Sequence, residues 1–260
     1  MNLPDDIVEA LARAGARLGP FQHLCWHEDV GSTNDIAMNA AMHGAPEGLV
    51  VAANAQRLGR GRLGRSWASP PGGGLYVSVV LHPRREALSL VTIAAGVAIA
   101  EGIEAATGLC AGVKWPNDVY VGTRKLAGIL AEAGSSAAGE HVILGFGINL
   151  QPAALPPEVA SRATSIEAEL GRPVDRGLVL AECLAALATR YQTLQRGAGD
   201  EVIGAWRLRA APHLGRHVEW DGDGGAQHGI AHDIDARGAL LVRVNDQIVR
   251  VISGEVRWLT

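Results

Sequence analysis

The hydrophobic and polar positions along the chain predict an α+β fold. Apolar runs of strand length occur at residues 23–30, 49–53, 75–81, 119–121, 125–133 and 141–149. Longer segments bounded by capping and helix-breaking residues predict helices at 32–43, 87–107, 165–170, 176–196 and 201–210, after a short helix within residues 1–20. Asp175 and Asp200 stand where the N-caps of the last two helices are expected. Short connections between residues 119 and 149 predict that the three strands there are antiparallel.

A change of pattern near Ala211 and Pro212 predicts a boundary between a larger unit, residues 1–211, and a smaller one, residues 212–260. Short strands separated by tight turns follow at residues 216–220, 227–235, 239–244, 247–252 and 256–259. The Asp235–Gly238 segment is typical of a hairpin turn. The second unit is therefore expected to be a small all-β barrel.

Composition narrows the class of protein. With 260 residues, 48% of them hydrophobic, the chain is long enough to bury a core. The net charge of −4 argues against a general nucleic-acid-binding surface. The three cysteines are far apart, which is typical of reduced thiols in a cytoplasmic protein. The nine histidines are not spaced as metal ligands, so no metal site is expected. Residues 87–100 are the most apolar stretch and are too short to span a bilayer, so no membrane partner is expected.

The segment Gly59–Trp67, which reads GRGRLGRSW, has the most unusual composition in the chain. Three arginines this close repel one another, and three glycines cost backbone order. An anionic ligand would offset both effects, because guanidinium groups bind it in a fork and glycine lets the backbone approach. A solvated basic surface loop is the alternative.

The same run matches G-x-G-x-x-G, the dinucleotide-binding fingerprint. A helix should follow it and present its N-terminus to a pyrophosphate. Residues 68–74, ASPPGGG, cannot hold a helix, and residues 82–85 offer no acidic ribose ligand. The fingerprint is therefore a false positive.

Four other segments carry candidate chemistry, and each also has a purely structural interpretation. Residues 114–118, KWPND, bring polar groups together but also make a good turn. Lys125 could be only a solvated edge residue, but it begins a strand of small residues that includes Gly128, which suggests close packing beside the ammonium group. Gly145 and Gly147 alternate on one strand face and leave room for a flat ligand or another backbone. Residues 32–34, Ser-Thr-Asn, are also ordinary helix-capping residues.

Taken in order, these segments strongly resemble a biotin–protein ligase. The matching pieces are Ser32–Asn34, Gln56 with Gly59–Trp67, Lys114–Asp118, Lys125–Leu130 and Gly145–Asn149, and Ser253–Glu255 resembles the C-terminal barrel of the family. The resemblance implies a catalytic domain related to class II aminoacyl-tRNA synthetases, with a mixed sheet, followed by an SH3-like barrel. Only 31 residues precede Ser32, too few for the DNA-binding winged helix of some members, so the short form without a DNA partner is expected.

The resemblance also implies the reaction and its participants. Biotin and ATP, the latter with Mg²⁺, give biotinyl-5′-AMP, and the biotin then passes to a lysine of a biotin carboxyl carrier protein domain of a carboxylase. A homodimer is compatible with this resemblance. By the same resemblance, catalysis falls to Lys125, Arg62 and Asp118. Biotin contacts are expected from Ser32, Thr33, Asn34, Gln56, Arg60, Gly61, Arg62, Lys125, Gly128, Gly145 and Gly147. ATP and adenylate contacts are expected from Arg60, Arg62, Arg65, Trp67, Lys114, Asn117, Lys125 and Asn149.

Two rival interpretations remain. A lipoate–protein ligase has a related fold and the same adenylation chemistry, but its arginine-serine-glycine signature is not matched by residues 69–74. A nucleic-acid-binding module would use the loop arginines with Trp67 as a stacking platform. The acidic net charge and the single short basic cluster count against the second rival.

Overall fold

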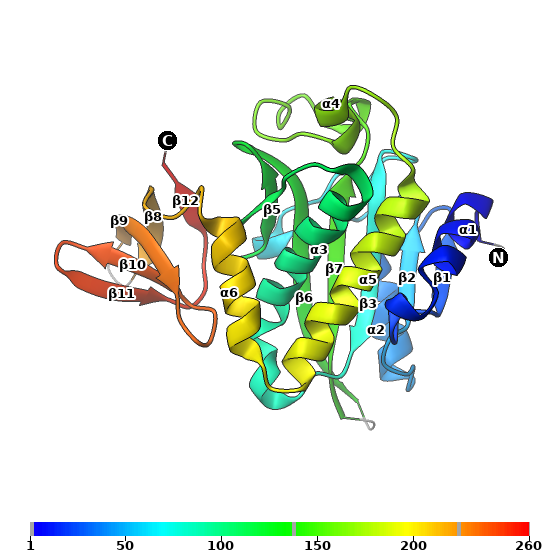
Figure 1. Ribbon diagram of the computed structural model, residues 1–260, viewed down its shortest axis with the longest axis horizontal. Helices are drawn as coiled ribbons and strands as arrows, with labels where there is room; N and C mark the ends of the chain where they lie inside the picture. The colour runs from blue at the N-terminus through cyan, green and yellow to red at the C-terminus, as the bar shows by residue number, and fades with distance from the viewer. Residues whose placement is uncertain (1–2, 137–138, 223–224, 260) are drawn as a thin grey trace.

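The computed structural model describes residues 3–136, 139–222 and 225–259, and its larger unit is built on a seven-stranded mixed sheet (Figure 1). The strand order is β1-β2-β3-β7-β6-β5-β4. The strands are β1 (Leu24–His27), β2 (Val50–Ala53), β3 (Gly74–Leu81), β4 (Gly112–Lys114), β5 (Asp118–Val121), β6 (Arg124–Ser136) and β7 (Gly139–Asn149). β1 and β2 are parallel, and the remaining neighbours pair antiparallel. The predicted α+β class and antiparallel β5-β6-β7 arrangement are confirmed.

Helices cover the two faces of this sheet unequally. The helices are α1 (Asp5–Ala14), α2 (Thr33–Met42), α3 (Val91–Thr107), α4 (Ile166–Leu170), α5 (Arg176–Gln195) and α6 (Gly199–Ala210). Short 3-10 turns lie at Gly15–Leu18, Arg62–Gly64, Arg85–Leu90 and Pro152–Ala154. α3 and α5 pack over one face with the main hydrophobic core between them and the strands, whereas α2 lies on the other face over a small cluster around Val51 and Ile143 (Figure 1).

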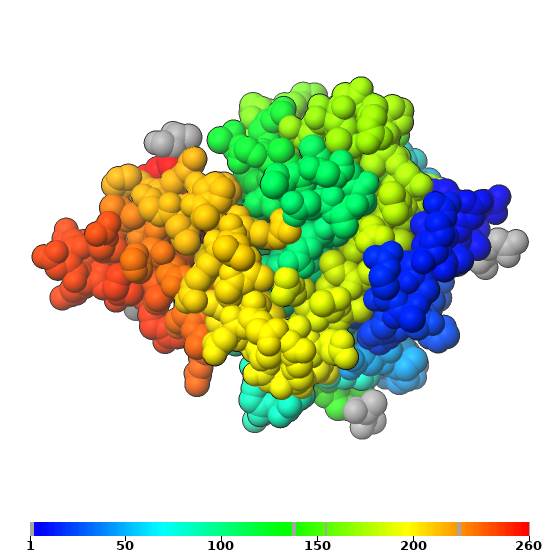
Figure 2. Space-filling view, in the orientation of Figure 1, coloured from blue at the N-terminus to red at the C-terminus, as the bar shows by residue number. Residues whose placement is uncertain are grey.

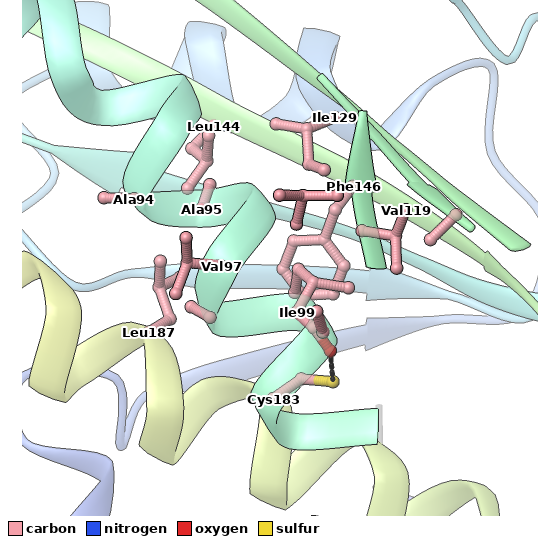
Figure 3. Packing of buried hydrophobic residues seen from close by; sticks show 14 of the residues in the cluster. Ala94, Ala95, Val97, Ile99, Val119, Ile129, Leu144, Phe146, Cys183 and Leu187 are labelled. Atoms are coloured by element: carbon pink, nitrogen blue, oxygen red, sulfur yellow. Dashed lines mark hydrogen bonds between the residues drawn. The ribbon is translucent and has the colours of Figure 1, made fainter. Parts of the chain in front are cut away.

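The core between α3 and α5 depends on a close approach of two helix backbones (Figure 3). Val97 and Ile99 on α3 are fully buried, as is Cys183 on α5, whose Sγ lies 3.8 Å from the Ile99 carbonyl oxygen. A Cβ atom at Gly102 would lie 2.4 Å from the Cys183 Cα. The helices therefore pack at a distance that only glycine permits at this position.

The residues from Arg85 to Thr107 are long and apolar enough to cross a membrane by length and composition alone. An 18-residue apolar stretch within this segment is 72% buried, and the segment packs against α5 and the sheet. Burial in the core accounts for its apolar composition. The prediction that this apolar segment is too short to span a bilayer was therefore wrong, because the helical segment continues to Thr107.

The smaller unit is a five-stranded antiparallel sheet with strand order β11-β10-β9-β8-β12, as expected. Its strands are β8 (His217–Gly222), β9 (Gly225–Ile234), β10 (Leu240–Val244), β11 (Gln247–Val251) and β12 (Val256–Trp258). Figure 2 shows this unit and the N-terminal segment at opposite ends of the molecule. The Trp115 indole donates to the Gly238 carbonyl at 2.8 Å and so ties the hairpin turn to the larger unit. We propose the division at residues 211–212, between α6 and β8.

The structure corrects three details of the predicted elements. The first strand covers only Leu24–His27, because the chain turns away before Val30 makes an isolated bridge to Gln56. Asp200 does not cap α6: the helix begins at Gly199, with Ala198 at the N-cap position. β4 has only three residues and is too short to leave a periodic signal of its own.

Candidate active site

The strand alternation places the candidate residues on the face of the sheet that carries α2. Ser78 on β3 is paired with Gly145 on β7, and Gly128 on β6 with Gly147. Paired residues in neighbouring strands point to the same side of a sheet, and residues two apart share a face. Glu132, four residues beyond Gly128, therefore faces the same side. The sheet supplies a floor of small residues under α2 and the Gly59–Trp67 loop.

A cavity of about 490 Å³, partly open to solvent, lies on this floor. All eleven residues expected to contact biotin line it: Ser32, Thr33, Asn34, Gln56, Arg60, Gly61, Arg62, Lys125, Gly128, Gly145 and Gly147. Trp67, Val77, Asn117, Ile129, Leu130 and Phe146 complete the lining. Segments up to about a hundred residues apart in the chain are thus brought together as expected.

One end of this cavity is a hydrogen-bonded amide and hydroxyl cluster. The Gln56 Oε1 accepts from the backbone N–H of Thr33 at 2.9 Å and lies 3.0 Å from its hydroxyl. The Gln56 amide donates to Ser69 at 3.0 Å. These contacts fix the orientation of the Gln56 amide, so the cluster is preorganised for a neutral polar ligand group.

Asn34 is held from both ends. Its Oδ1 accepts from the fully buried hydroxyl of Ser78, and its Nδ2 donates to Glu132 at 2.6 Å. A Cβ atom at Gly145 would lie 2.2 Å from the Asn34 Oδ1. Gly145 is therefore required because the Asn34 amide sits against the strand, which differs from the expected flat ligand or backbone.

Gly147 makes room for a side chain in the same way. Its Cβ would lie 2.5 Å from the Trp67 Nε1, and one at Gly128 would lie 3.0 Å from the same indole. Trp67 lines this cavity and also a second one, which extends towards the smaller unit. The indole therefore lies between the two cavities and covers the glycine floor.

The Gly59–Trp67 loop closes on itself as a short hairpin. The backbone N–H of Gly61 donates to the Arg65 carbonyl at 2.7 Å, and that of Trp67 donates to Gly59 at 2.9 Å. Leu63 at the tip has φ of 57°, a left-handed conformation that costs a non-glycine residue roughly 1 kcal/mol. The three arginine side chains leave this hairpin in different directions.

Arg60 is bound by two carboxylates. Its Nη1 donates to Asp35, and its Nη2 donates to Glu132 at 2.9 Å. Burial lowers the pKa of Arg60, but these hydrogen bonds outweigh it and the net shift is upward. The charge of Arg60 is therefore largely neutralised by the protein itself.

Arg62 has different surroundings. Its guanidinium donates to the Asn117 side-chain oxygen at 3.2 Å and to the Gly254 carbonyl at 3.4 Å. Burial lowers its pKa, whereas the charges of Asp118 and Glu255 act in the opposite direction. Within the described residues no salt bridge joins Arg62 to a carboxylate, so its charge is available to an anion.

Lys125 lies where the two cavities meet. Its ammonium nitrogen is 2.6 Å from the Asp118 Oδ1 and 5.4 Å from the centre of the Trp67 ring. The backbone of Lys125 donates to the Arg162 carbonyl at 2.9 Å and accepts from Thr164 at 2.8 Å. The segment after β7 thus holds the strand end that presents the ammonium group.

A second cavity, of about 990 Å³ and also partly open to solvent, continues from the first and extends to the smaller unit. It is lined by Gly61, Arg62, Leu63, Arg65, Ser66, Trp67, Lys114, Trp115, Pro116, Asn117, Asp118, Tyr120, Lys125 and residues 254–258. Six of the eight residues expected to contact ATP lie here, and Arg60 lines only the first cavity of the two. Asn149 lines neither, because its amide turns away to donate to the Thr164 carbonyl.

Lys114 occupies an aromatic enclosure in the second cavity. Its ammonium lies 4.5 Å from the centre of the Tyr120 ring and 5.4 Å from that of Trp258 on β12. Burial is the main cause of its lowered pKa. Lys114 and Lys125 are the only lysines in the sequence, and both line this cavity. In a chain that uses arginine elsewhere, two lysines at one site indicate a need for compact ammonium groups.

Known proteins are similar to this one over most of the chain. The model of the Biotin/lipoate A/B protein ligase family matches residues 28–149, and that of the Biotin protein ligase C terminal domain matches residues 213–257. The Bifunctional ligase/repressor BirA of Bacillus subtilis is 33% identical to this chain. The match covers 97% of this chain and 79% of the length of that protein. The chain belongs to the biotin/lipoate A/B protein ligase family.

Two further comparisons cover other organisms. The Biotin--[acetyl-CoA-carboxylase] ligase of Mycobacterium tuberculosis is 36% identical over 87% of this chain and 85% of its own. The Biotin protein ligase from Aquifex aeolicus, solved in complex with biotin and ATP, superposes with a TM-score of 0.80 at 30% identity, covering 92% of this chain and 99% of that one. The match to the family model ends at Asn149 and includes every site residue expected from the sequence.

Several residues of the candidate site could not be recognised from the sequence. Ser78 lies within an ordinary apolar strand, and Glu132 within a run of alanines and glycines. Glu255, whose carboxylate pairs with Arg65, is separated from it by 190 residues. Only the alternation of β6, which puts Glu132 on the face of Gly128, could have pointed to one of them.

The described residues contain no group of three or more histidine, cysteine, aspartate or glutamate side chains that could hold a metal ion. Asp118 and Glu255 in the second cavity are paired with Lys125 and Arg65. The protein's own donor set therefore does not fit a resident metal.

Acid should destabilise the contact between the two units through His213. This ring is buried between Tyr120 and Trp258, and burial, with the charges of Lys114 and Arg216, lowers its pKa to about 4. The unfolded chain takes up this proton near its ordinary pKa of 6.5, so stability is lost as the pH falls from about 6.5 towards 4. We expect His213 to account for about 2 kcal/mol of destabilisation between pH 7.5 and pH 5.

Urea unfolding at the two pH values checks this expectation. His213→Phe should lose less stability on acidification than the wild type, whereas His43→Gln, a change at an exposed histidine, should behave as the wild type does. Equal losses in the His213→Phe and wild-type proteins would contradict it.

Proposed function

We propose that the protein is an ATP-dependent biotin–protein ligase, which forms biotinyl-5′-AMP and transfers biotin to a lysine of a biotin carboxyl carrier protein domain. The observation that carries this proposal is the position of Lys125 and Arg62. Both line the hydrogen-bonding cavity and the adjoining larger one, so two anionic reactants bound in these cavities would meet at these cations. Membership of the ligase family supports the same activity.

In the first half-reaction a biotin carboxylate oxygen attacks the α-phosphorus of ATP, and pyrophosphate leaves. We assign the neutral ureido ring of biotin to the Thr33, Asn34 and Gln56 cluster, because a buried polar ring needs hydrogen-bond partners. Negative charge builds on the α-phosphoryl oxygens during transfer, and fixed cations stabilise it. Arg62 and Lys125 are the proposed cations, and the nucleotide extends towards Lys114 and Trp67 in the second cavity.

In the second half-reaction the ε-amine of the acceptor lysine attacks the carbonyl carbon of the mixed anhydride, an amide forms and AMP leaves. The attacking amine must lose a proton, and Asp118 is the proposed group to orient or accept it. The Asp118 carboxylate lines the nucleotide cavity, next to Lys125. Trp67 and the Gly59–Trp67 loop over the cavity would exclude water from this anhydride.

Asp118→Asn should slow the transfer of biotin from preformed biotinyl-5′-AMP to an acceptor domain by about 10²-fold, because general-base assistance is lost. Single-turnover transfer, with synthetic adenylate and without ATP, measures this step alone. Asp246→Asn, at an exposed turn of the smaller unit, is the control. Transfer at the wild-type rate by Asp118→Asn would show that this assignment is wrong.

The remaining participants follow from the same proposal. Mg²⁺ would enter with ATP and be held by its phosphate oxygens, since the donor set of the protein does not fit an independent ion. The three cysteines are free, which supports a cytoplasmic location. The acceptor is proposed to be the carrier domain of a biotin-dependent carboxylase. The relative from Mycobacterium tuberculosis is named as a ligase that acts on such a carboxylase, acetyl-CoA-carboxylase.

Biotin-dependent exchange of labelled pyrophosphate into ATP tests the proposal without an acceptor. We expect exchange with biotin and none with lipoate. Exchange with lipoate alone would favour a lipoate–protein ligase, which the family also contains. No exchange with either acid would overturn the proposed activity.

A further inference from the structure

Glu132 lies outside the cavity proposed for biotin yet contacts two of its lining residues. One carboxylate oxygen, Oε2, accepts from the Asn34 amide at 2.6 Å and from the Arg60 guanidinium at 2.9 Å. Asn34 belongs to the first turn of α2, Arg60 to the Gly59–Trp67 loop, and Glu132 to β6. A single oxygen atom thus joins three separate segments beside the cavity.

These contacts determine how the Asn34 amide is oriented. The Ser78 hydroxyl donates to Asn34 Oδ1 from one side, and Glu132 accepts from Nδ2 on the other. An anionic acceptor can receive only the N–H side of an amide, so the reversed orientation would place oxygen against carboxylate. Glu132 therefore selects which end of the amide faces Ser78 and keeps it against Gly145.

The same carboxylate determines where the loop lies. Arg60 bridges Glu132 and Asp35, whose side chains are 32% and 55% exposed. Charge-assisted hydrogen bonds of this kind are the stronger ones, and here two of them bind one guanidinium. Because Arg60 is already neutralised, Arg62 is better placed than Arg60 to hold an anion, which agrees with the catalytic role that the sequence assigned to Arg62 alone of the two.

We infer that Glu132 is a positioning residue that couples the biotin cavity to the Gly59–Trp67 loop by binding Asn34 and Arg60 together. This inference rests on the proposed function. Loss of the carboxylate frees the Asn34 amide and the Arg60 guanidinium, which both line the biotin cavity and not the nucleotide cavity. Arg62, which lines both cavities, keeps its separate contacts to Asn117 and Gly254. The effect therefore falls on biotin more than on ATP.

Biotin-dependent pyrophosphate exchange by Glu132→Gln measures this effect. Hydrogen bonds to a charged partner predict a rise of roughly 10- to 100-fold in the KM for biotin. The KM for ATP should change by less than about threefold, since neither Glu132 nor its partners Asn34 and Arg60 line the second cavity. Glu140→Gln is the matched control: it removes an exposed carboxylate from β7 in the same hairpin, 3.9 Å from Arg85, and should leave both values unchanged.

A double-mutant cycle with Arg60→Met tests whether Glu132 acts through the loop. Contacting residues give non-additive effects, so the double variant should show a smaller rise in the KM for biotin than the product of the two single rises. Limited trypsin digestion should also cleave the loop arginines faster in Glu132→Gln than in the Glu140→Gln control.

Three outcomes would overturn the inference: an unchanged KM for biotin in Glu132→Gln, equal rises for biotin and ATP, or fully multiplicative effects in the cycle. Each requires a wild-type protein that catalyses the exchange. A wild type without exchange would overturn the proposed function instead, so the two failures are distinguishable. Asp35→Asn, which keeps the Glu132 contacts and removes one Arg60 partner, should give a smaller rise than Glu132→Gln.

Discussion

Lys125→Met should lower the kcat of biotin-dependent pyrophosphate exchange by about 10³-fold, the upper end of the effect of removing one charged donor from a transition state. Methionine keeps an unbranched apolar stem that is one atom shorter than that of lysine, and it lacks the ammonium group. The ammonium of Lys125 is 2.6 Å from Asp118 and lies at the junction of the two cavities. Its loss leaves Arg62 as the cation common to both cavities among the described residues.

Arg124→Met supplies the control for this substitution. Arg124 is the adjacent cation on β6, pairs with Glu169 at 2.7 Å, and lines neither cavity. Exchange by Arg124→Met should stay within about twofold of the wild type, because surface ion pairs contribute little. If Lys125→Met retained a tenth or more of the wild-type kcat, the ammonium would not be at the reacting centre.

Gly102→Ala should destabilise the protein by about 3 kcal/mol or more, near the upper limit for overpacking in a core. The added Cβ would lie 2.4 Å from the Cα and 2.6 Å from the backbone nitrogen of Cys183. The α5 backbone must move to accept it, since no flexible side chain can yield. The core shown in Figure 3 would therefore lose contacts along the whole interface of α3 and α5.

Gly96→Ala, on the same helix, is the matched control. Its Cβ would meet only the Val113 Cγ1, at 3.9 Å, which is ordinary contact. Alanine there should stabilise the protein by roughly 0.5–1 kcal/mol through helix propensity alone. Urea unfolding of both variants measures the difference, and a Gly102→Ala protein as stable as Gly96→Ala would refute the close-packing explanation.

The positions of most elements could be predicted because their signals are local. A strand such as Leu75–Leu81 is recognised from its apolar run and its flanking turns, and α5 from its N-cap Asp175, whose carboxylate accepts from the Leu178 amide. Asp200 failed as a cap because α6 begins one residue earlier, at Gly199, so Asp200 lies within the first turn of the helix. β4 was too short for its periodicity to be read.

Part of the candidate site could also be predicted from the sequence. The resemblance of five motifs to a ligase family named eleven residues for the biotin site, and all eleven line one cavity. Asn149 lines neither cavity, since its amide donates to the Thr164 carbonyl, and its contact with the adenylate stays a prediction. The glycines at 145 and 147 were recognised as special, but their neighbours proved to be side chains of the site itself.

The sequence by itself determined the elements and the α+β class, because periodicity and turn chemistry act over a few residues. The site residues were named by the resemblance of its motifs to a ligase family. Only the tertiary structure decided which charges pair. Arg60 takes Glu132 from 72 residues away, and Arg62 reaches the Gly254 carbonyl across 192. Such contacts leave no periodic trace along the chain, since they depend on strand register and on where the smaller unit docks.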